Sequence, residues 1–320
     1  MGRTKMKRWC AGVALVGLLP LAGCSSESTI NSDSTPKAGS QGTVTIAVYP
    51  WVGYEADVAV VSHILTTKLG YKVETKKMTA KESWPALESG TIDVVLENWA
   101  HAAEKKSYID EKKAVVHLGN SGNKGVIGWY VPMWMAQQYP DIRDWNNLNK
   151  YASLFKTSAT GAKGQLLDGD TSYTTNDPSL VANLKLNYQV TNSGSEDATV
   201  QAAIDASKNR TPLLFYFWEP HWLFRQQKFA KINLPAYTTG CDSDPAKVAC
   251  DYEAYPLDKL GSKKFVDKGG KAVEFLKNFS WSNADQNELA DYLVNEKLSP
   301  ADAATRWMDA HPDTWQSWMP

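Results

Sequence analysis

Residues 87–99 read Leu-Glu-Ser-Gly-Thr-Ile-Asp-Val-Val-Leu-Glu-Asn-Trp, and this stretch decides how the first part of the chain folds. A short helix over 83–88 is predicted to stop at Gly90, because glycine is the usual residue after a helix end. The apolar run 92–96 is typical of a buried strand. Trp99 follows the carboxyl end of that strand, where open α/β sheets bind their ligands. The stretch therefore predicts an indole at a ligand-binding edge of a sheet.

The residues before this stretch alternate between strand and helix patterns. A strand is predicted over 44–49, a helix with one apolar face over 55–69, and a second strand over 71–74. With the strand at 92–96 they form a βαβαβ unit, which requires a parallel sheet with right-handed crossovers. The same patterns recur later, as strands over 125–131 and 213–217 and helices over 179–186 and 198–206. Two α/β units are therefore expected.

Composition excludes several classes of protein. The 320 residues carry a net charge of −1, and no basic cluster follows residue 8, which argues against nucleic acid or an anionic membrane as partner. No Gly-x-Ser-x-Gly turn or His-Glu-x-x-His helix is present, so the chain is not expected to be an enzyme. No Walker loop or dinucleotide fingerprint occurs, and the five histidines are scattered. No cofactor and no metal site are therefore predicted.

The first residues predict export. A basic beginning is followed by an apolar stretch over 9–21, too short to span a bilayer. The Leu-Ala-Gly-Cys ending at 21–24 resembles a bacterial lipobox, which implies cleavage before Cys24 and a lipid on its sulfur. We expect a lipoprotein signal peptide over 1–23 and a flexible tether over 24–42, with the mature domain exported and held at the outer face of the cell membrane, or in the periplasm, by the lipid anchor only. A plain signal peptide is the alternative.

The remaining cysteines predict a disulfide. Once Cys10 leaves with the signal peptide and Cys24 carries a lipid, Cys241 and Cys250 are an even pair in an oxidising compartment. They flank a short polar segment that could close a bridge. Metal binding is the alternative, but no histidine lies between them and two thiolates alone make a poor site.

The thirteen tryptophans point to the kind of ligand. A second apolar run, Leu-Leu-Phe-Tyr-Phe-Trp-Glu-Pro-His-Trp at 213–222, ends with Trp218 and Trp222. Indole faces hold a cation that cannot donate hydrogen bonds, which favours a quaternary ammonium compound. One desolvated cation–π contact contributes about 2 kcal/mol, whereas micromolar affinity needs about 8 kcal/mol, so several rings must act together.

Four segments resemble a known family in its own order. They are the stretch at 87–99, Phe-Trp-Glu-Pro-His-Trp at 217–222, Lys-Asn-Phe-Ser-Trp-Ser at 277–282 and Ala-Ala-Thr-Arg-Trp at 303–307. The chain is similar to glycine betaine/choline-type substrate-binding proteins of ABC importers from about Gly42 to Trp318. The resemblance implies an α/β, two-lobe, periplasmic-binding-protein-like fold, whose hinge-connected lobes close on a ligand held in a box of aromatic rings.

The resemblance also divides the chain. We expect the first part of lobe 1 over 43–131, lobe 2 over 132–235, and a return segment with C-terminal helices of lobe 1 over 236–320. The crossing segments are accordingly predicted near 131–132 and 234–235.

Carried over residue by residue, the resemblance places Trp99 and Trp218 in the box. Tyr173, in the loop 169–177, takes the place of a further family tryptophan. His221 matches a histidine that contacts the ligand carboxylate in some members, and we prefer it to His101. Further candidates near strand ends or in the loop are Trp51, Tyr54, Trp129, Thr171 and Ser172; for Trp51 and Trp129, core packing is the alternative.

The ligand stays open between two chemistries. If an acidic residue faces the cation, choline or another ligand without a carboxylate is favoured; the candidates are Glu97, Asp57 and Asp170. If hydroxyls of the loop and a histidine face the other end, glycine betaine is favoured. The expected function is to capture a quaternary ammonium solute and deliver it to a membrane permease served by a separate ATPase subunit. The alternative is a receptor of the same fold for another solute, such as carnitine, an amino acid or a sulfonate.

Overall fold

The computed structural model describes residues 39–173 and 175–320. The predicted signal peptide, Cys24 and most of the predicted tether lie outside the described residues. Within them, no helix is both long enough and apolar enough to cross a membrane.

The first α/β unit has the predicted order. Its elements are β1 (Thr43–Val48), α1 (Val52–Thr67), β2 (Lys72–Lys77), α2 (Ala80–Ser89) and β3 (Val94–Asn98). Strand β1 pairs in parallel with both β2 and β3, which confirms the predicted βαβαβ unit. Helix α2 ends at Gly90, whose φ of 77° lies in the left-handed region that glycine adopts without strain. The carboxyl ends of β1 and β3 therefore lie at one edge of the sheet.

The second α/β unit is built on another parallel group of strands. Strands β5 (Gly164–Asp168), β6 (Tyr188–Asn192) and β7 (Phe215–Glu219) pair in parallel through β5, and β8 (Phe229–Lys231) pairs with β4 (Val115–Pro132). Its helices are α4 (Met133–Gln138), α5 (Leu148–Tyr151), α6 (Asp177–Asn183), α7 (Glu196–Asn209) and α8 (Leu223–Gln226). The sequence did not predict β5 or β6.

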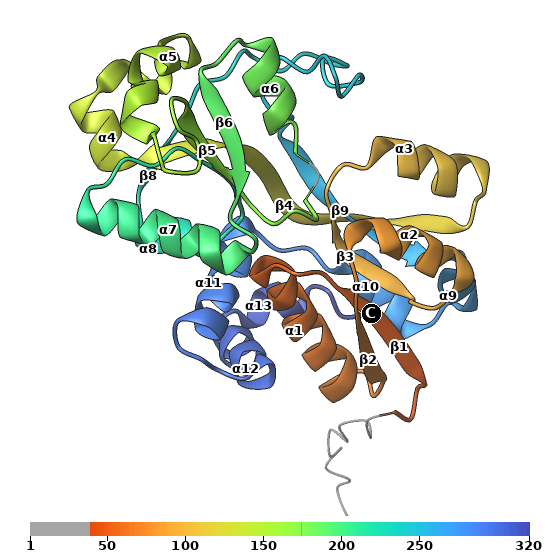
Figure 1. Ribbon diagram of the computed structural model, residues 1–320. Coiled ribbons are helices and arrows are strands. Elements are labelled where there is room, and N and C mark those ends of the chain that lie inside the picture. The colour runs from red at the N-terminus through yellow and green to blue at the C-terminus, as the bar shows by residue number, and fades with distance from the viewer. Residues whose placement is uncertain (1–38, 174) are drawn as a thin grey trace, which may run out of the picture. The chain divides into compact units, whose positions relative to one another are not determined.

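Two long strands join the units (Figure 1). Strand β4 pairs antiparallel with β9 (Tyr255–Ser262) from Val115 to Gly125, and with β7 from Val126 to Tyr130. The strand order is β2-β1-β3-β9-β4-β7-β5-β6, with β8 beside β4. The chain therefore passes from the first unit, lobe 1, to the second unit, lobe 2, between Gly125 and Val126, and returns just before β9.

The C-terminal helices return to lobe 1. They are α9 (Lys263–Lys268), α10 (Lys271–Asn278), α11 (Asn283–Val294), α12 (Pro300–Ala310) and α13 (Pro312–Gln316), while α3 (Ala102–Lys105) continues into a turn of π-helix over 106–111. Ser282 and Ser299 accept hydrogen bonds from the backbone N–H three residues later, so Ser-Asn-Ala-Asp at 282–285 and Ser-Pro-Ala-Asp at 299–302 cap their helices, as these sequence patterns predict. Helices α11 and α12 pack against α1.

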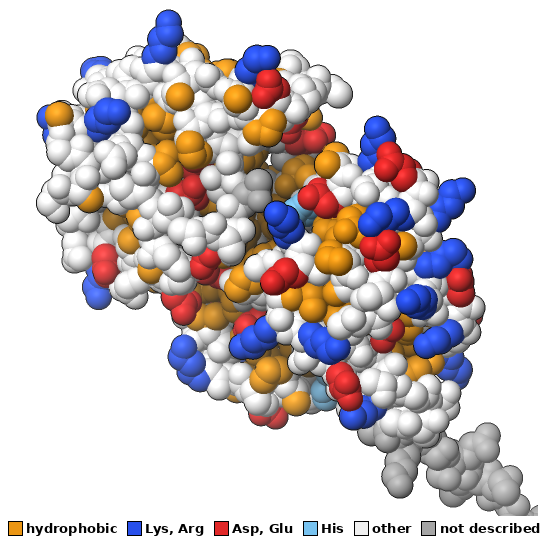
Figure 2. Space-filling view, turned by 45° about the vertical axis from the view of Figure 1, so that its right-hand side comes forward, with side chains coloured by type: hydrophobic (Ala, Val, Ile, Leu, Met, Phe, Trp, Pro, Cys, Tyr) orange, Lys and Arg blue, Asp and Glu red, His pale blue; other side chains and the backbone are white. Residues whose placement is uncertain are grey.

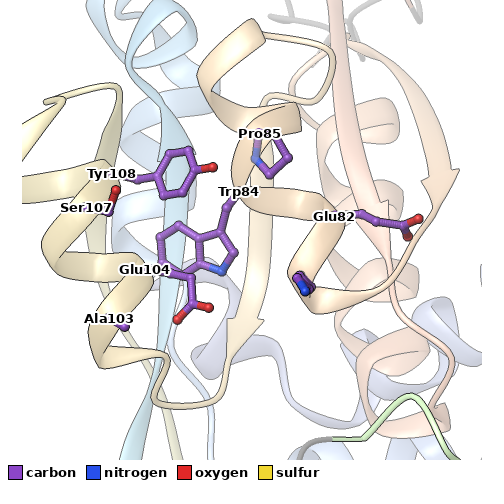
Figure 3. Close-up of a pocket in the computed structure, with 8 residues that line it drawn as sticks. Glu82, Trp84, Pro85, Ala103, Glu104, Ser107 and Tyr108 are labelled. Atoms are coloured by element: carbon purple, nitrogen blue, oxygen red, sulfur yellow. The ribbon is translucent and has the colours of Figure 1, made fainter.

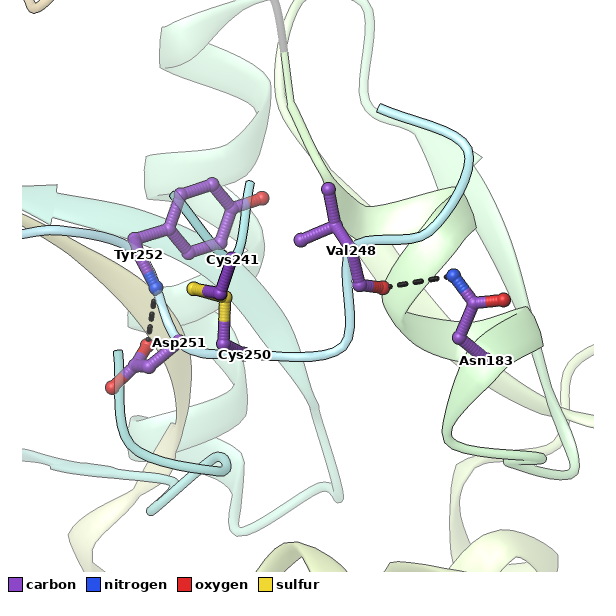
Figure 4. Close-up of a disulfide and its surroundings, with 6 residues drawn as sticks. All are labelled: Asn183, Cys241, Val248, Cys250, Asp251 and Tyr252. Carbon is purple, nitrogen blue, oxygen red and sulfur yellow. Dashed lines mark hydrogen bonds between the residues drawn. A yellow bond between two sulfur atoms is a disulfide. The ribbon is translucent and has the colours of Figure 1, made fainter. Parts of the chain in front are cut away.

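A disulfide joins Cys241 to Cys250, as the sequence predicted, with their Cα atoms 6.4 Å apart. The side-chain amide of Asn183 on α6 donates to the carbonyl of Val248 inside the bridged loop (Figure 4). The loop therefore packs on lobe 2.

The packing of this loop and the register of β4 bear on the lobe limits. A crossing at 131–132 would fall where β4 is still paired with β8 in lobe 2, and a return at 235 would assign the disulfide loop to lobe 1. We therefore propose lobe 2 over 126–254, in place of 132–235.

Candidate ligand-binding site

Rings from both lobes meet at the carboxyl ends of the parallel strands. Trp51 follows β1, Trp99 follows β3, Tyr173 lies in the loop after β5, and Trp218 lies near the end of β7. The ring centroids of Trp51 and Tyr173 are 6.3 Å apart, and those of Tyr173 and Trp218 are 5.5 Å apart, both edge to face. Trp99 is joined to Trp51 through a shared carboxyl group. We call these four residues the aromatic cluster.

Two glycines allow these rings to lie close to the backbone. A Cβ atom on Gly125 would lie 2.8 Å from the Trp99 ring, and a Cβ atom on Gly169 would lie 2.8 Å from the Tyr173 ring. Real Cβ contacts are longer than this, so any other residue would displace the ring. The crossing strand and the loop after β5 thus fix one ring each by backbone shape.

Glu97 orients the lobe 1 indoles. Its side chain is buried, and its Oε1 accepts hydrogen bonds from Trp51 Nε1 at 2.9 Å and from Trp99 Nε1 at 2.5 Å. Gln286 on α11 donates to the other oxygen and also to Asp57. Burial, and next the neighbouring Glu97, raise the pKa of Asp57 well above its usual value. Glu97 is thus the carboxyl group that is hydrogen-bonded to the indoles of the cluster. Three N–H donors hold it, from Trp51, Trp99 and Gln286.

Both ring nitrogens of His221 have hydrogen-bond partners within the protein. Its Nδ1 accepts a hydrogen bond from Leu223 N–H at 3.1 Å, which places the proton on Nε2. That Nε2 lies 2.6 Å from Oε1 of Glu196, the first residue of α7. The other oxygen of Glu196 accepts from the backbone N–H of Val52 at 3.0 Å. His221 therefore lies beside the cluster, 5.6 Å from the Trp218 ring, but its partner there is a glutamate.

The remaining predicted residues lie at different distances from the cluster. Tyr54 is fully buried, its ring is 5.8 Å from Trp51, and its hydroxyl accepts from Leu96 N–H, so it supports Trp51 and β3. Thr171 and Ser172 are exposed in the loop that carries Tyr173. The structure does not bring Trp129 to the cluster.

Trp129 belongs to the core of lobe 2. It is fully buried among apolar side chains, and its Nε1 donates to Asp177 at 2.7 Å. The hydroxyl of Tyr252 donates to the same carboxyl oxygen. Its position in the middle of β4, where it faces the lobe 2 core, accounts for the difference from the prediction.

The charged side chain that is hydrogen-bonded to rings of the cluster is acidic, since Glu97 accepts from Trp51 and Trp99. Within residues 39–173 and 175–320, no lysine or arginine donates to Glu97 or Glu196, and none lies over a ring of the cluster. The same residues contain no group of three or more His, Cys, Asp or Glu placed to hold a metal ion. The face in Figure 2 shows both signs of charge interspersed around a hollow beside hydrophobic side chains.

A separate pocket of about 540 Å³ lies on the surface of lobe 1 between α2 and α3 (Figure 3). Trp84 and Tyr108 line it, with their ring centroids 5.7 Å apart, and Glu104 lies beside them. None of the predicted ligand-binding residues lines this pocket. His101 packs against Trp84, on this side of the molecule.

Comparison with known proteins decides the family. Residues 42–310 match the family described as the substrate binding domain of ABC-type glycine betaine transport systems. The chain belongs to this family. It is a family of extracytoplasmic substrate-binding proteins, which deliver small solutes to a permease, and not of enzymes. This confirms the predictions that the chain is not an enzyme and that it works outside the cytoplasm, whereas the lipid anchor stays a prediction.

Individual relatives are distant but cover most of the chain. The trimethylamine N-oxide-binding protein of Pelagibacter ubique (strain HTCC1062) is 24% identical over 288 residues, which are 87% of this chain and 91% of the relative. Two solved structures are similar in fold. Lactococcal OpuAC, closed on glycine betaine, has a TM-score of 0.66 at 18% identity and covers 87% of this chain and 99% of its own. ProX from Borrelia burgdorferi has a TM-score of 0.68 at 20% identity, with 87% and 97% covered. The predicted two-lobe α/β fold is confirmed.

Proposed function

We propose that the protein captures a quaternary ammonium solute in the aromatic cluster and delivers it to the permease of an ABC transporter whose ATPase is a separate subunit. The observation that carries the proposal is the meeting of Trp51 from lobe 1 with Tyr173 and Trp218 from lobe 2, while Trp99 shares an oxygen of Glu97 with Trp51. Aromatic faces attract a cation, and an alkylated ammonium group offers no hydrogen bond that a polar site could satisfy.

The charges near the cluster support a cation over an anion. Glu97 places a carboxyl group against the indoles of Trp51 and Trp99. A cationic side chain at the site favours the acid group of a sulfonate or an amino acid, and among the described residues no lysine or arginine donates to Glu97 or lies over a ring of the cluster. We therefore rank the quaternary ammonium solute above a solute of another class.

The mechanism that follows is closure on the ligand. Each lobe supplies two rings, so neither lobe alone surrounds the cation. A ligand that contacts both lobes stabilises the closed form by its differential affinity for it. The permease then receives the closed, loaded form.

The test is a thermal-shift panel. The solutes are glycine betaine, choline, carnitine, trimethylamine N-oxide, taurine and the common amino acids. A ligand that binds only the folded protein stabilises it by about 2.7 kcal/mol at a hundredfold excess over Kd, so at least one trimethylammonium compound should raise Tm. A clear shift with taurine or an amino acid, and none with any trimethylammonium compound, would refute the proposal.

A lipid on Cys24 is part of the proposal, since the Leu-Ala-Gly-Cys ending carries the lipobox pattern. Mass spectrometry of the mature N-terminus should show an acylated cysteine, and Cys24→Ala should abolish membrane association. Membrane association unchanged in Cys24→Ala, with no acyl mass on the wild type, would contradict it.

A further inference from the structure

The start of α1 receives its hydrogen-bond partner from the other lobe. Trp51 precedes the helix and offers no side-chain acceptor, so the first N–H groups of α1 need a partner from elsewhere. The Oε2 of Glu196 supplies it, 3.0 Å from Val52 N and 144 residues away in the chain. A carboxyl group at this helix end is also favoured by the helix dipole.

The same carboxyl group takes the proton-bearing nitrogen of His221. Leu223 N–H holds Nδ1 as an acceptor, so Nε2 is the donor, and it points at Oε1 of Glu196. Both side chains are buried, with His221 1% and Glu196 9% exposed. The two donors that could bind a ligand's acid group here are therefore both used by one glutamate.

Glu196 lies at an end of the aromatic cluster. Val52 directly follows Trp51, and the His221 ring is 5.6 Å from the Trp218 ring. A trimethylammonium group among the rings can direct its remaining substituent toward Glu196.

We propose that Glu196 determines specificity: its carboxyl group occupies the anion-binding donors of Val52 and His221, so the ligand is a trimethylammonium compound that carries no carboxylate. This inference rests on the proposed function. A ligand carboxylate near Glu196 would face a second carboxylate without a cation between them, which is unfavourable. A hydroxyl, as in choline, can instead donate to Glu196.

The experiment is calorimetric titration of the full chain with choline and with glycine betaine. The two probes share the trimethylammonium group and differ at the other end. The wild type should bind choline about a hundredfold more tightly than glycine betaine, because like charges repel in a desolvated site. Equal affinities, or a preference for glycine betaine, would overturn the inference and leave the proposed function standing.

A matched pair of variants locates the effect. Glu196→Gln keeps the size of the side chain and removes its charge, and should narrow the choline preference at least tenfold. Asp197→Asn removes a charge from the next residue, which is exposed, and should leave the preference within twofold. An unchanged preference in Glu196→Gln would overturn the inference. If neither probe nor any other trimethylammonium compound binds the wild type, the proposed function is refuted, and the inference that rests on it is refuted as well.

Discussion

The two lobes hold their halves of the aromatic cluster in different ways. In lobe 1, the indoles of Trp51 and Trp99 both donate to one oxygen of the buried Glu97. In lobe 2, Tyr173 and Trp218 are placed by ring packing, and the Tyr173 hydroxyl is buried without a hydrogen-bond partner among the described residues. Hydrogen bonds fix an orientation, whereas packing fixes a position only while the neighbouring ring stays in place.

Lobe 1 is therefore the half whose rings are oriented before the ligand binds. The two indoles of lobe 1 are oriented by hydrogen bonds to Glu97, a residue of the same lobe. Tyr173 lies on a loop, and one of its neighbouring rings, Trp51, belongs to lobe 1. We therefore expect a first encounter of the ligand with lobe 1, and ordering of the lobe 2 rings as the lobes close.

The largest expected effect is on the free energy of unfolding. It arises at Asp177, which is buried in the core of lobe 2 beside Trp129. Burial, and next the neighbouring Asp168, raise its pKa from 3.8 to about 7. Because the folded protein keeps a proton that the unfolded chain releases, stability falls as pH rises from about 4 to about 7, by on the order of 4 kcal/mol. Asp177→Asn should remove this slope and raise Tm at pH 8, as measured by denaturant unfolding and Tm across that range.

The control for this prediction is Asp244→Asn, which changes an exposed carboxyl group in the disulfide loop of the same lobe. It should keep the wild-type pH profile. A wild-type slope in Asp177→Asn would show that Asp177 is not the group responsible.

The next largest effect is expected on ligand affinity at Glu97, which orients the lobe 1 indoles. Glu97→Ala removes the acceptor of two indole N–H groups, and hydrogen bonds to a charged group contribute about 1.5–3 kcal/mol each, so affinity should fall at least about a hundredfold. Glu97→Gln, which keeps one acceptor oxygen, should lose less. The affinity is measured by calorimetric titration of the ligand. The control is Glu111→Ala, which removes an exposed glutamate of the same lobe. If Glu97→Ala binds like Glu111→Ala, the two halves of the cluster do not differ as described.

Single indoles come next. Trp99→Ala and Trp218→Ala should each cost about 2 kcal/mol, roughly thirtyfold in affinity, because each removes a cation–π face and an apolar wall. Trp134→Ala is the matched control, since this indole lies against α7 with its N–H on the carbonyl of Ala206. Binding within twofold of wild type in both cluster variants would show that these rings do not hold the ligand.

The smallest effect is at the Tyr173 hydroxyl. Because this hydroxyl has no partner within the described residues, Tyr173→Phe should bind within about threefold of wild type and be no less stable. Tyr173→Trp should hold or improve affinity, since indole has the stronger negative face. A large loss in Tyr173→Phe would mean that the hydroxyl binds the ligand itself.

Sequence patterns predicted the parts of the fold whose signals are local. The apolar face of α1, Gly90 after α2 and the serine caps of α11 and α12 all depend on neighbouring residues, and each is present. Strand β9 was missed because Tyr-Pro-Leu-Asp-Lys-Leu-Gly-Ser lacks strand alternation. Its buried Lys259 is satisfied by the carbonyls of Lys277 and Phe279, which only the tertiary structure supplies.

In the candidate site, too, the sequence identified the residues that have a local signal and missed one that has none. Tryptophans after strands pointed to Trp99 and Trp218, because strand ends are recognisable in the sequence. Glu196 gave no such signal, since an acidic residue after the cap Ser195 is ordinary at the start of a helix. Its partner Val52 N–H lies in the other lobe.

Two ligands of equal shape test whether the aromatic cluster recognises a positive charge. Choline and its uncharged carbon isostere, 3,3-dimethylbutan-1-ol, are titrated into the full chain under identical conditions. A desolvated cation–π contact contributes about 2 kcal/mol, so choline should bind and the isostere should bind at least about thirtyfold more weakly. Affinities of choline and the isostere within a factor of two of each other would contradict recognition of the positive charge, whereas failure of choline alone to bind would overturn only the inference about Glu196.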